Sequence, residues 1–297
     1  MYDSIIIGAG IAGITSAIYL KRANKKILII ERNIPGGQIT KTSRIDNYPG
    51  FIGDGATFAN VMLEQLKLHD IKINYEKVID IINEEKVKKV KTENGEYLAS
   101  TVIIATGRVP RKQNFDNEEK LTGKGVSYCA SCDGYFYRKE DVVVQGGGNS
   151  ALEESLLLSN IAKTVTIIHR KNQFTADQIL IDEVNKRDNI KVIYNSVIEE
   201  LIEDNGVLSA IKLNNNQIIK TKALFIYIGL IPSSYFTSKL GIKTEKDYII
   251  VNDKMETSIK GIFACGDIIK KELYQLVSAA SEGATAAINV IKYIKEL

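Results

Sequence analysis

A strand, a glycine-rich turn, a helix and a second strand follow one another twice in this chain, and this repeat limits the folds open to it. The first copy places the turn "GAGIAG" between a buried strand at 2–7 and a helix that ends near Ala23. Three glycines at this spacing turn the chain tightly, let the backbone approach a pyrophosphate, and let helix and strand pack closely. They are Gly8, Gly10 and Gly13. The pattern therefore predicts a dinucleotide-binding α/β domain.

The residue that ends the next strand strengthens this prediction. Glu31 lies at the end of the apolar strand "KKILIIER", 18 positions after Gly13. A carboxylate at this place accepts hydrogen bonds from a ribose 2′-hydroxyl. A tight turn without a ligand is the less favoured alternative.

The second copy is "VVVQGGGNSALEESLLL" followed by "KTVTIIHR". Its turn has Gly146 and Gly148, and Ala151 takes the third glycine position. Asn149 and Ser150 open the helix that follows, where the free amides of a helix N-terminus attract phosphate. This copy therefore predicts a second nucleotide site.

The end of the following strand differs in charge between the two copies. His169 lies 18 positions after Ala151, from 151 to 169, and Arg170 and Lys171 follow it. A carboxylate would repel a 2′-phosphate, whereas these cations can hold one through charge-assisted hydrogen bonds. NADPH is therefore favoured over NADH at the second site. A solvated basic strand end is the alternative, and His169 alone would be weak support.

Landmarks around the two copies indicate how the domains are connected. "VIIATGRVP" at 102–110, with its Thr106–Gly107 turn, marks the exit from the first domain. "ALFIYIGLIP" at 223–232 closes the second, and the C-terminal segment has no glycine fingerprint of its own. We expect an α/β protein with two Rossmann-like three-layer (ββα) dinucleotide-binding domains, the second inserted into the first. The boundaries are predicted at 1–109 with 237–297, and at 110–236.

Length and charge exclude several classes of protein. The 297 residues suit two domains better than one. The net charge of +3 arises from 39 basic and 36 acidic residues without a block of one sign, so no nucleic-acid partner is expected. No apolar run approaches the roughly 18 residues of a membrane span, and no leader precedes the first strand. We expect a cytoplasmic protein without a membrane partner.

Two of the three cysteines lie in "CASCDGYF", as Cys129 and Cys132. The pair could be a redox couple, half of a metal site, or a coincidence of composition. A structural zinc site normally needs four ligands, and here only Cys265 and two distant histidines remain, so no metal is expected. In a reducing compartment the redox interpretation is favoured, because this spacing permits a reversible disulfide and a lowered thiol pKa.

The neighbouring acid and the two nucleotide sites fit that interpretation. Asp133 follows the pair directly and can pass a proton to a departing thiolate, although it can equally be a helix N-terminal acid. A nicotinamide releases two electrons and a disulfide needs two, and a flavin is the natural relay between them. We therefore expect electrons to pass from nicotinamide to flavin, then to Cys129–Cys132, then to an external disulfide. Cys265 is expected to be only a small buried side chain.

The ordered motifs resemble one family over essentially the whole chain, the low-molecular-weight thioredoxin reductases. They are "GAGIAG", "GGQITKTSRIDNYPG", "ATG", "CASCDG", "GGGNSALEE", "IGLIP" and "GIFACGD". The resemblance implies a homodimeric FAD enzyme that reduces thioredoxin and rotates one domain, so that the flavin meets either the dithiol or the nicotinamide. It further implies that Cys132 faces the flavin, that Cys129 attacks the partner's disulfide, and that Asp133 is the acid.

The resemblance also implies which residues hold FAD beyond the first glycine turn and Glu31. These are Gly36, Gly37, Gln38, Asn47, Thr106, Gly107, Gly266, Asp267 and Gln275.

Three departures from the family pattern concern the electron donor. Lys171 and Thr175 stand where NADPH-dependent members usually carry arginines, and Tyr274 stands where an arginine usually precedes Gln275. Lysine lacks the planar fork of arginine, so NADH or reduced ferredoxin stays an alternative donor. A peroxiredoxin-linked or glutaredoxin-like protein stays open as the acceptor. A nucleotide-sensing protein without catalytic activity is the non-enzymatic alternative.

Overall fold

The structure is a computed structural model that describes residues 1–42 and 45–297. Residues 43–44, within the quoted "GGQITKTSRIDNYPG", lie outside the described residues. Backbone contacts divide the chain into two compact units, and each is described by itself. Unit 1 joins residues 1–109 to 231–297, and unit 2 contains residues 110–230.

The chain passes between the units through two short strands, β9 (Arg108–Pro110) and β18 (Leu230–Pro232), which pair with each other. The crossings between the compact units lie at 109/110 and 230/231, and the domain boundaries expected from the sequence, 109/110 and 236/237, stay predictions. The segment after β18 packs in unit 1. Its Phe236 is fully buried there, and the Ser233 amide donates to the Gly107 carbonyl at 2.9 Å.

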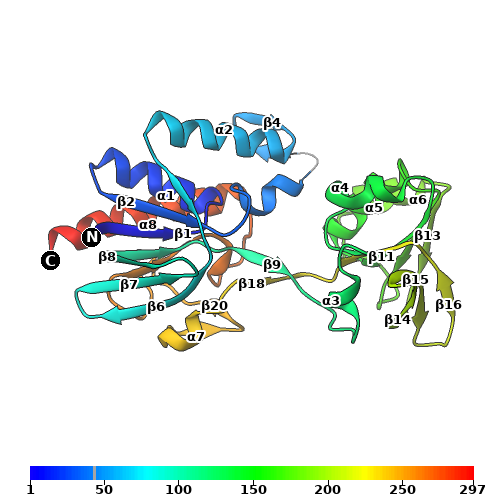
Figure 1. The fold of residues 1–297 in the computed structure, drawn as a ribbon. Coiled ribbons are helices and arrows are strands. Elements are labelled where there is room, and N and C mark those ends of the chain that lie inside the picture. Colours follow the sequence, from blue (N-terminus) through cyan, green and yellow to red (C-terminus); the bar gives the residue numbers. More distant parts are fainter. Residues whose placement is uncertain (43–44) are drawn as a thin grey trace. The chain divides into compact units, whose positions relative to one another are not determined.

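Unit 1 is built on a seven-stranded sheet in the order β5-β2-β1-β8-β7-β6, with β21 pairing with β8 (Figure 1). The strands β5, β2, β1, β8 and β21 pair with one another in parallel, whereas β7 pairs antiparallel with both β8 and β6. The strands are β1 (Tyr2–Ile7), β2 (Ile27–Glu31), β5 (Ile73–Tyr75), β6 (Val78–Glu84), β7 (Val87–Thr92), β8 (Glu96–Ile104) and β21 (Ile262–Ala264). The C-terminal segment thus supplies a strand to the sheet that begins at the N-terminus.

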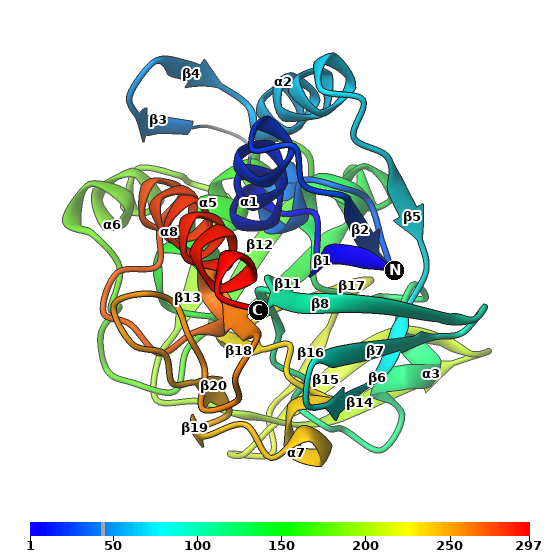
Figure 2. The ribbon, with the colours of Figure 1, turned by 90° about the vertical axis from the view of Figure 1, so that its left-hand side faces the viewer.

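Alternate side chains of β1 face two different cores, as expected of a strand buried on both sides. Ile6 belongs to the core beneath the three long helices, α1 (Ile11–Arg22), α2 (Gly55–Leu68) and α8 (Leu276–Lys295). Ile5 and Ile7 belong to the core on the opposite face. The helix α8 lies beside α1 (Figure 2), and the Ser16 hydroxyl of α1 donates to the Gly283 carbonyl of α8 at 2.9 Å.

Shorter elements complete unit 1. They are η1 (Gly37–Lys41), β3 (Ile45–Tyr48), β4 (Phe51–Gly53), α7 (Thr237–Leu240), β19 (Thr244–Glu245), β20 (Tyr248–Ile249) and η3 (Gly266–Ile268).

Unit 2 has three layers: helices, a parallel sheet and an antiparallel sheet. The parallel sheet has the order β10 (Val126–Ser127), β17 (Ala223–Tyr227), β11 (Asp141–Gly146), β12 (Thr164–Ile168) and β13 (Ile190–Ile193). The antiparallel sheet contains β14 (Ile198–Asp204), β15 (Val207–Leu213) and β16 (Ile218–Lys220). The helical elements are α3 (Glu118–Leu121), α4 (Ala130–Asp133), η2 (Gly134–Tyr137), α5 (Asn149–Ser159) and α6 (Gln178–Asn185).

The side chains of β11 separate these layers. Val142 and Val144 lie in the core shared with α5 and α6, and Val143 lies in the core shared with the antiparallel sheet. This alternation gives the three-layer ββα arrangement that the sequence predicts.

The contact between α1 and α8 yields a stability prediction. A side chain at Gly283 would place its Cβ 2.3 Å from the Ala12 carbonyl oxygen, which is backbone and cannot move aside. We expect Gly283→Ala to lower the free energy of unfolding by about 1–3 kcal/mol despite the higher helix propensity of alanine. Urea unfolding curves measure this change. Gly95→Ala, whose Cβ would meet nothing within 4 Å, is the control; an equal loss in both variants would contradict the prediction.

Candidate functional site

The three glycines of the first turn have different surroundings. A Cβ at Gly8 would lie 2.3 Å from the Ala105 carbonyl oxygen, and one at Gly13 would lie 2.0 Å from the Gly8 carbonyl oxygen. A Cβ at Gly10 would meet only the Gly36 oxygen at 4.0 Å. The protein's own packing therefore requires glycine at the first and third positions, whereas at Gly10 the missing side chain leaves space above the helix N-terminus.

The residues of unit 1 around this turn fit FAD. Gly10 is the N-cap of α1 and no side chain caps it, so the first amides of the helix are free to receive a pyrophosphate. The carboxylate of Glu31 accepts hydrogen bonds from the backbone amides of Ala9 and Asn33, each at 2.8 Å. These bonds fix the carboxylate beside the turn. A carboxylate has further lone pairs for a ribose hydroxyl. These groups suit a dinucleotide.

Other residues predicted to hold FAD are brought to the same end of the sheet. The Gly36 amide donates to the Ala9 carbonyl at 2.7 Å, which fastens the "GGQ" loop to the glycine turn. The side-chain amide of Asn47 donates to Gln275 Oε1 at 3.2 Å. A Cβ at Gly266 would lie 2.8 Å from that of Ala12 in the first turn of α1. The "GGQ" loop and the "CGD" turn therefore both contact the region where α1 begins, outside the carboxyl end of β1, where α/β proteins bind ligands.

Most of the charged side chains in this region are not predicted from the sequence. We define the Arg108 cluster as Arg108, Asp267, Lys271, Tyr274 and Glu282. Burial raises the pKa of Glu282, which accepts the Gly266 amide at 2.9 Å. Only Asp267 of these five is expected at the site, because an arginine after a strand gives no sequence signal of its own.

The second glycine turn repeats the geometry of the first. A Cβ at Gly146 would lie 2.4 Å from the Tyr227 carbonyl oxygen, whereas one at Gly148 would meet only Thr175 Oγ1 at 3.9 Å. Gly148 is the N-cap of α5, again without a side-chain cap, and Asn149 and Ser150 are exposed in the first turn of the helix. Unit 2 thus also has an open helix N-terminus suited to phosphate.

His169 directly follows β12, and its side chain is buried. Its ring packs beneath the turn, since a Cβ at Gly147 would come within 2.3 Å of the imidazole, and it lies against Phe174 and Tyr194. Burial lowers its pKa, so the neutral form is favoured in the folded protein. His169 therefore shapes the glycine turn from below, and a direct contact with a nucleotide stays a prediction.

The loop after His169 is fastened to the same turn by Thr175, which the sequence marks only as a missing arginine, and by Asp177, which it does not single out. Thr175 bonds to the Gly147 carbonyl twice, through its amide at 2.8 Å and its hydroxyl at 3.2 Å. Asp177 bonds reciprocally to Asn149, at 2.7 Å and 2.8 Å.

Arg170 and Lys171 are exposed, and neither forms an ion pair within residues 1–42 and 45–297. Both cations are thus available to an anion from solution.

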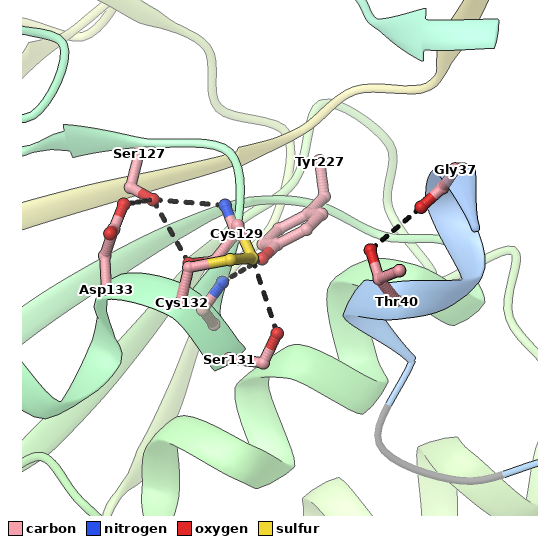
Figure 3. Close-up of a disulfide and its surroundings, with 9 residues drawn as sticks. Gly37, Thr40, Ser127, Cys129, Ser131, Cys132, Asp133 and Tyr227 are labelled. Atoms are coloured by element: carbon pink, nitrogen blue, oxygen red, sulfur yellow. Dashed lines mark hydrogen bonds between the residues drawn. A yellow bond between two sulfur atoms is a disulfide. The ribbon is translucent and has the colours of Figure 1, made fainter. Parts of the chain in front are cut away.

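Cys129 and Cys132 form a disulfide at the start of α4 (Figure 3). Their Cα atoms are 5.3 Å apart, within the range that a disulfide needs. Cys129 is buried and is the N-cap of α4, whereas Cys132 is exposed. The redox role predicted for this pair stays a prediction, and a position at the start of a helical turn is one that favours a thiolate.

Neighbouring side chains fix the helix that carries the disulfide. The Ser127 hydroxyl donates to Asp133 Oδ2 at 2.6 Å and accepts the Cys129 amide at 3.1 Å. The Tyr227 hydroxyl, also drawn in Figure 3, accepts the Ala130 amide at 2.7 Å. Burial raises the pKa of Tyr227, so this phenol stays protonated. Asp133 is thereby held beside the dithiol, and Ser127 and Tyr227 are positioning residues that the sequence does not reveal.

The third cysteine belongs to the core. Cys265 is fully buried and free, and burial raises the pKa of its thiol to about 12, so it stays unreactive at neutral pH. No group of three or more histidine, cysteine or acidic side chains is placed to bind a metal ion in the described part of the chain. Across the same residues, no helix combines the length and apolar character that a membrane crossing requires.

The chain belongs to the pyridine nucleotide-disulphide oxidoreductase family, whose sequence profile matches residues 2–284. Within the family its relatives are thioredoxin reductases. The thioredoxin reductase of Bacillus subtilis (strain 168) is 42% identical over 100% of this chain and 96% of its own length. The structure of Lactococcus lactis thioredoxin reductase aligns with a TM-score of 0.94 at 38% identity, covering 100% of both chains. A ferredoxin-flavin thioredoxin reductase from Clostridium acetobutylicum aligns with a TM-score of 0.56 at 29% identity, covering 100% and 99%.

These findings confirm the resemblance drawn from the motifs and the fold of two Rossmann-like domains. The chain is an oxidoreductase, and its family implies FAD together with a nicotinamide donor. The non-catalytic alternative is not favoured, since the relatives are reductases by name.

The buried position of His169 predicts a pH dependence of stability. Because its folded pKa is lowered, the unfolded chain takes up a proton below about pH 6.5 that the folded chain resists. The free energy of unfolding should therefore fall as the pH drops through this region, by up to about 1.4 kcal/mol per pH unit from this group. Urea midpoints between pH 7.5 and 5 should show a shallower decline in His169→Gln. His69→Gln, which keeps His169, is the control, and an unchanged slope in His169→Gln would contradict the prediction.

Proposed function

We propose that the chain is an FAD-dependent thioredoxin-disulfide reductase that takes electrons from NADPH. The observation that carries the proposal is the Cys129–Cys132 disulfide at a helix N-terminus, in the unit that also contains the second glycine turn. Unit 1 supplies the first turn and Glu31 for FAD. When bound, FAD supplies the two-electron relay between nicotinamide and sulfur.

The protein's own residues account for the sulfur chemistry. Two electrons and two protons open the disulfide to the Cys129 and Cys132 thiols. The Cys129 thiolate attacks the acceptor disulfide, which forms a mixed disulfide and releases one acceptor thiolate; Asp133 can protonate a departing sulfur. Attack by Cys132 on Cys129 then restores the original disulfide and releases the second acceptor sulfur. The buried position of Cys129 and the exposure of Cys132 require that Cys129 become accessible during this cycle.

NADPH is proposed as donor because Arg170 and Lys171 are exposed cations that directly follow His169, whose ring packs against the second glycine turn. A second donor, NADH, is kept for a specific reason. Thr175 directs its hydroxyl to the Gly147 carbonyl, and Asp177 adds a carboxylate next to Asn149, so discrimination in favour of a 2′-phosphate is weakened. Reduced ferredoxin is the third candidate, suggested by the name of the Clostridium acetobutylicum relative.

The remaining parts of the proposal follow the family. They are thioredoxin as acceptor, a cytoplasmic location, a homodimer, and rotation of one domain about the two crossings. Residues 1–109 with 231–297 are assigned to FAD, and residues 110–230 to the nicotinamide and the dithiol.

Anaerobic stopped-flow absorbance with NADPH, NADH and reduced ferredoxin tests the donor and the flavin together. The purified protein should be yellow, and NADPH should bleach it. If ferredoxin bleaches the flavin and NADPH does not, the donor assignment fails while the role of the dithiol stands. A colourless protein with no affinity for FAD would overturn the whole proposal.

Replacing one sulfur separates flavin reduction from turnover. Cys132→Ser should lower thioredoxin reduction at least about 1000-fold, because no disulfide can accept the electrons, while NADPH still bleaches the flavin. An insulin-precipitation assay with thioredoxin measures turnover. Cys265→Ser, which changes only the buried cysteine, should keep turnover close to wild type. Undiminished turnover in Cys132→Ser would refute the dithiol route.

An arginine at position 171 should increase the preference for NADPH over NADH. Lys171→Arg is expected to lower the KM for NADPH about 10-fold and to leave that for NADH unchanged, because only the 2′-phosphate gains a bidentate contact. Steady-state kinetics with both donors measure the ratio. Lys191→Arg, at an exposed lysine of β13, is the control. Equal changes for NADPH and NADH would show that Lys171 does not contact the phosphate.

A further inference from the structure

Arg108 lies where several segments predicted to bind FAD meet, all within unit 1. It directly follows the Thr106–Gly107 turn at the end of β8. Its backbone carbonyl accepts the Gln38 side-chain amide at 2.9 Å. Its guanidinium contacts Asp267 and Tyr274, the neighbour of Gln275. One residue therefore touches the "GGQ" loop, the "CGD" turn and the start of α8.

The charges around Arg108 are paired, with two cations and two carboxylates. Arg108 Nη2 lies 3.0 Å from Asp267 Oδ2, and Lys271 Nζ lies 3.3 Å from Asp267 Oδ1. The same lysine binds Glu282 at 2.9 Å. Both oxygens of Asp267 are thus engaged by cations, and Asp267 would stay paired with Lys271 if Arg108 were removed.

The ring of Tyr274 fixes the plane of the guanidinium. Arg108 Cζ lies 4.1 Å from the centre of this ring, within the range of a cation–π contact. Stacking on one face and the bond from Nη2 to Asp267 together orient the group, so its remaining N–H directions are set by the protein.

One of those directions has no protein acceptor. Arg108 Nε is buried and has no hydrogen-bond partner among residues 1–42 and 45–297, while the side chain is only 17% exposed. A buried charged donor without an acceptor is costly, and native proteins rarely leave one unsatisfied. The oriented but unpaired Nε indicates that a ligand supplies the acceptor.

We propose that Arg108 binds FAD, with Nε donating to an oxygen of the flavin mononucleotide half of the cofactor. This inference rests on the proposed function. The half is assigned by the neighbours of Arg108. The resemblance implies that Asp267 lies at the ribityl and phosphate region of FAD and Gln275 near the flavin ring, whereas Glu31 is placed for the adenosine ribose. The acceptor is a ribityl hydroxyl or a phosphate oxygen, and both offer the same charge-assisted hydrogen bond.

Ligand binding by the deflavinated protein tests the proposal without measuring activity. Arg108→Met should bind FAD about 10- to 100-fold more weakly than wild type, as the loss of one charge-assisted hydrogen bond predicts. Binding of FMN should weaken by the same factor, and binding of ADP should not change. Riboflavin distinguishes the two acceptors: an equal loss for riboflavin indicates a ribityl hydroxyl, and a loss confined to FMN and FAD indicates the phosphate. Fluorescence titration measures FAD, FMN and riboflavin, and isothermal titration calorimetry measures ADP.

Controls separate binding from structural support. Arg22→Met, at the exposed end of α1, should bind every ligand as wild type does. Arg108→Lys keeps the charge without the fork and should give an intermediate loss, which keeps the test available if Arg108→Met does not fold. The rise in melting temperature on adding FAD should shrink in Arg108→Met, with the melting temperature of the apoprotein nearly unchanged.

Two outcomes would overturn the inference. One is wild-type affinity for FAD and FMN in both Arg108 variants. The other is a fall in the apoprotein's melting temperature with an undiminished rise on adding FAD, which would show a purely structural role. If wild-type protein itself binds no FAD, the proposed function fails first, so the two failures are distinguishable.

Discussion

Close approach of backbone to backbone at the two glycine turns is the constraint on which both units depend. At Gly8 and at Gly146 a side chain would collide with the carbonyl oxygen of a neighbouring strand, at 2.3 Å and 2.4 Å. The chain can therefore leave β1 or β11 and enter a helix only where these side chains are missing. Because the turn is so tight, the helix N-terminus points into open space, and Gly10 and Gly148 keep that space clear. The open helix N-terminus, which suits a phosphate, and the path of the chain from strand to helix therefore both result from the same tight glycine turn.

The backbone features are predictable because they rest on local rules. The spacing of glycines, the apolar strands and the charge at the end of the following strand predict β1, α1, β2 and Glu31, and the same rules apply to β11, α5 and β12. The "IGLIP" motif does not reveal that Phe236, a few residues later, packs into the core of unit 1. Contacts between distant segments, such as Ser127 with Asp133 or Tyr227 with Ala130, depend on the folded sheet and leave no local pattern.

Position 274 shows how a departure from a family pattern can be misjudged from sequence alone. Tyr274 replaces an arginine expected from the resemblance, which suggests a weakened site. In the folded chain the guanidinium of Arg108 lies on the Tyr274 ring, 4.1 Å from its centre. A cation is therefore present beside Gln275, contributed by another segment of the chain. Sequence comparison at one position detects the loss of a charge, but only the tertiary structure shows where a charge has been regained.

The contacts that shape each predicted site lie within a single unit. This is relevant to the proposed rotation of one domain about the two crossings. The dithiol helix is fixed by Ser127 and Tyr227, both in unit 2. The segments predicted to bind FAD are joined by bonds from Gln38 to Arg108 and from Asn47 to Gln275, all in unit 1. The chain itself links the units only through β9 and β18. The hydrogen bonds named here each lie within one unit, so the proposed rotation does not require any of them to break. An enzyme that must present one flavin alternately to a nicotinamide and to a dithiol requires this independence, because rebuilding either site in every cycle would cost several hydrogen bonds at about 1 kcal/mol each.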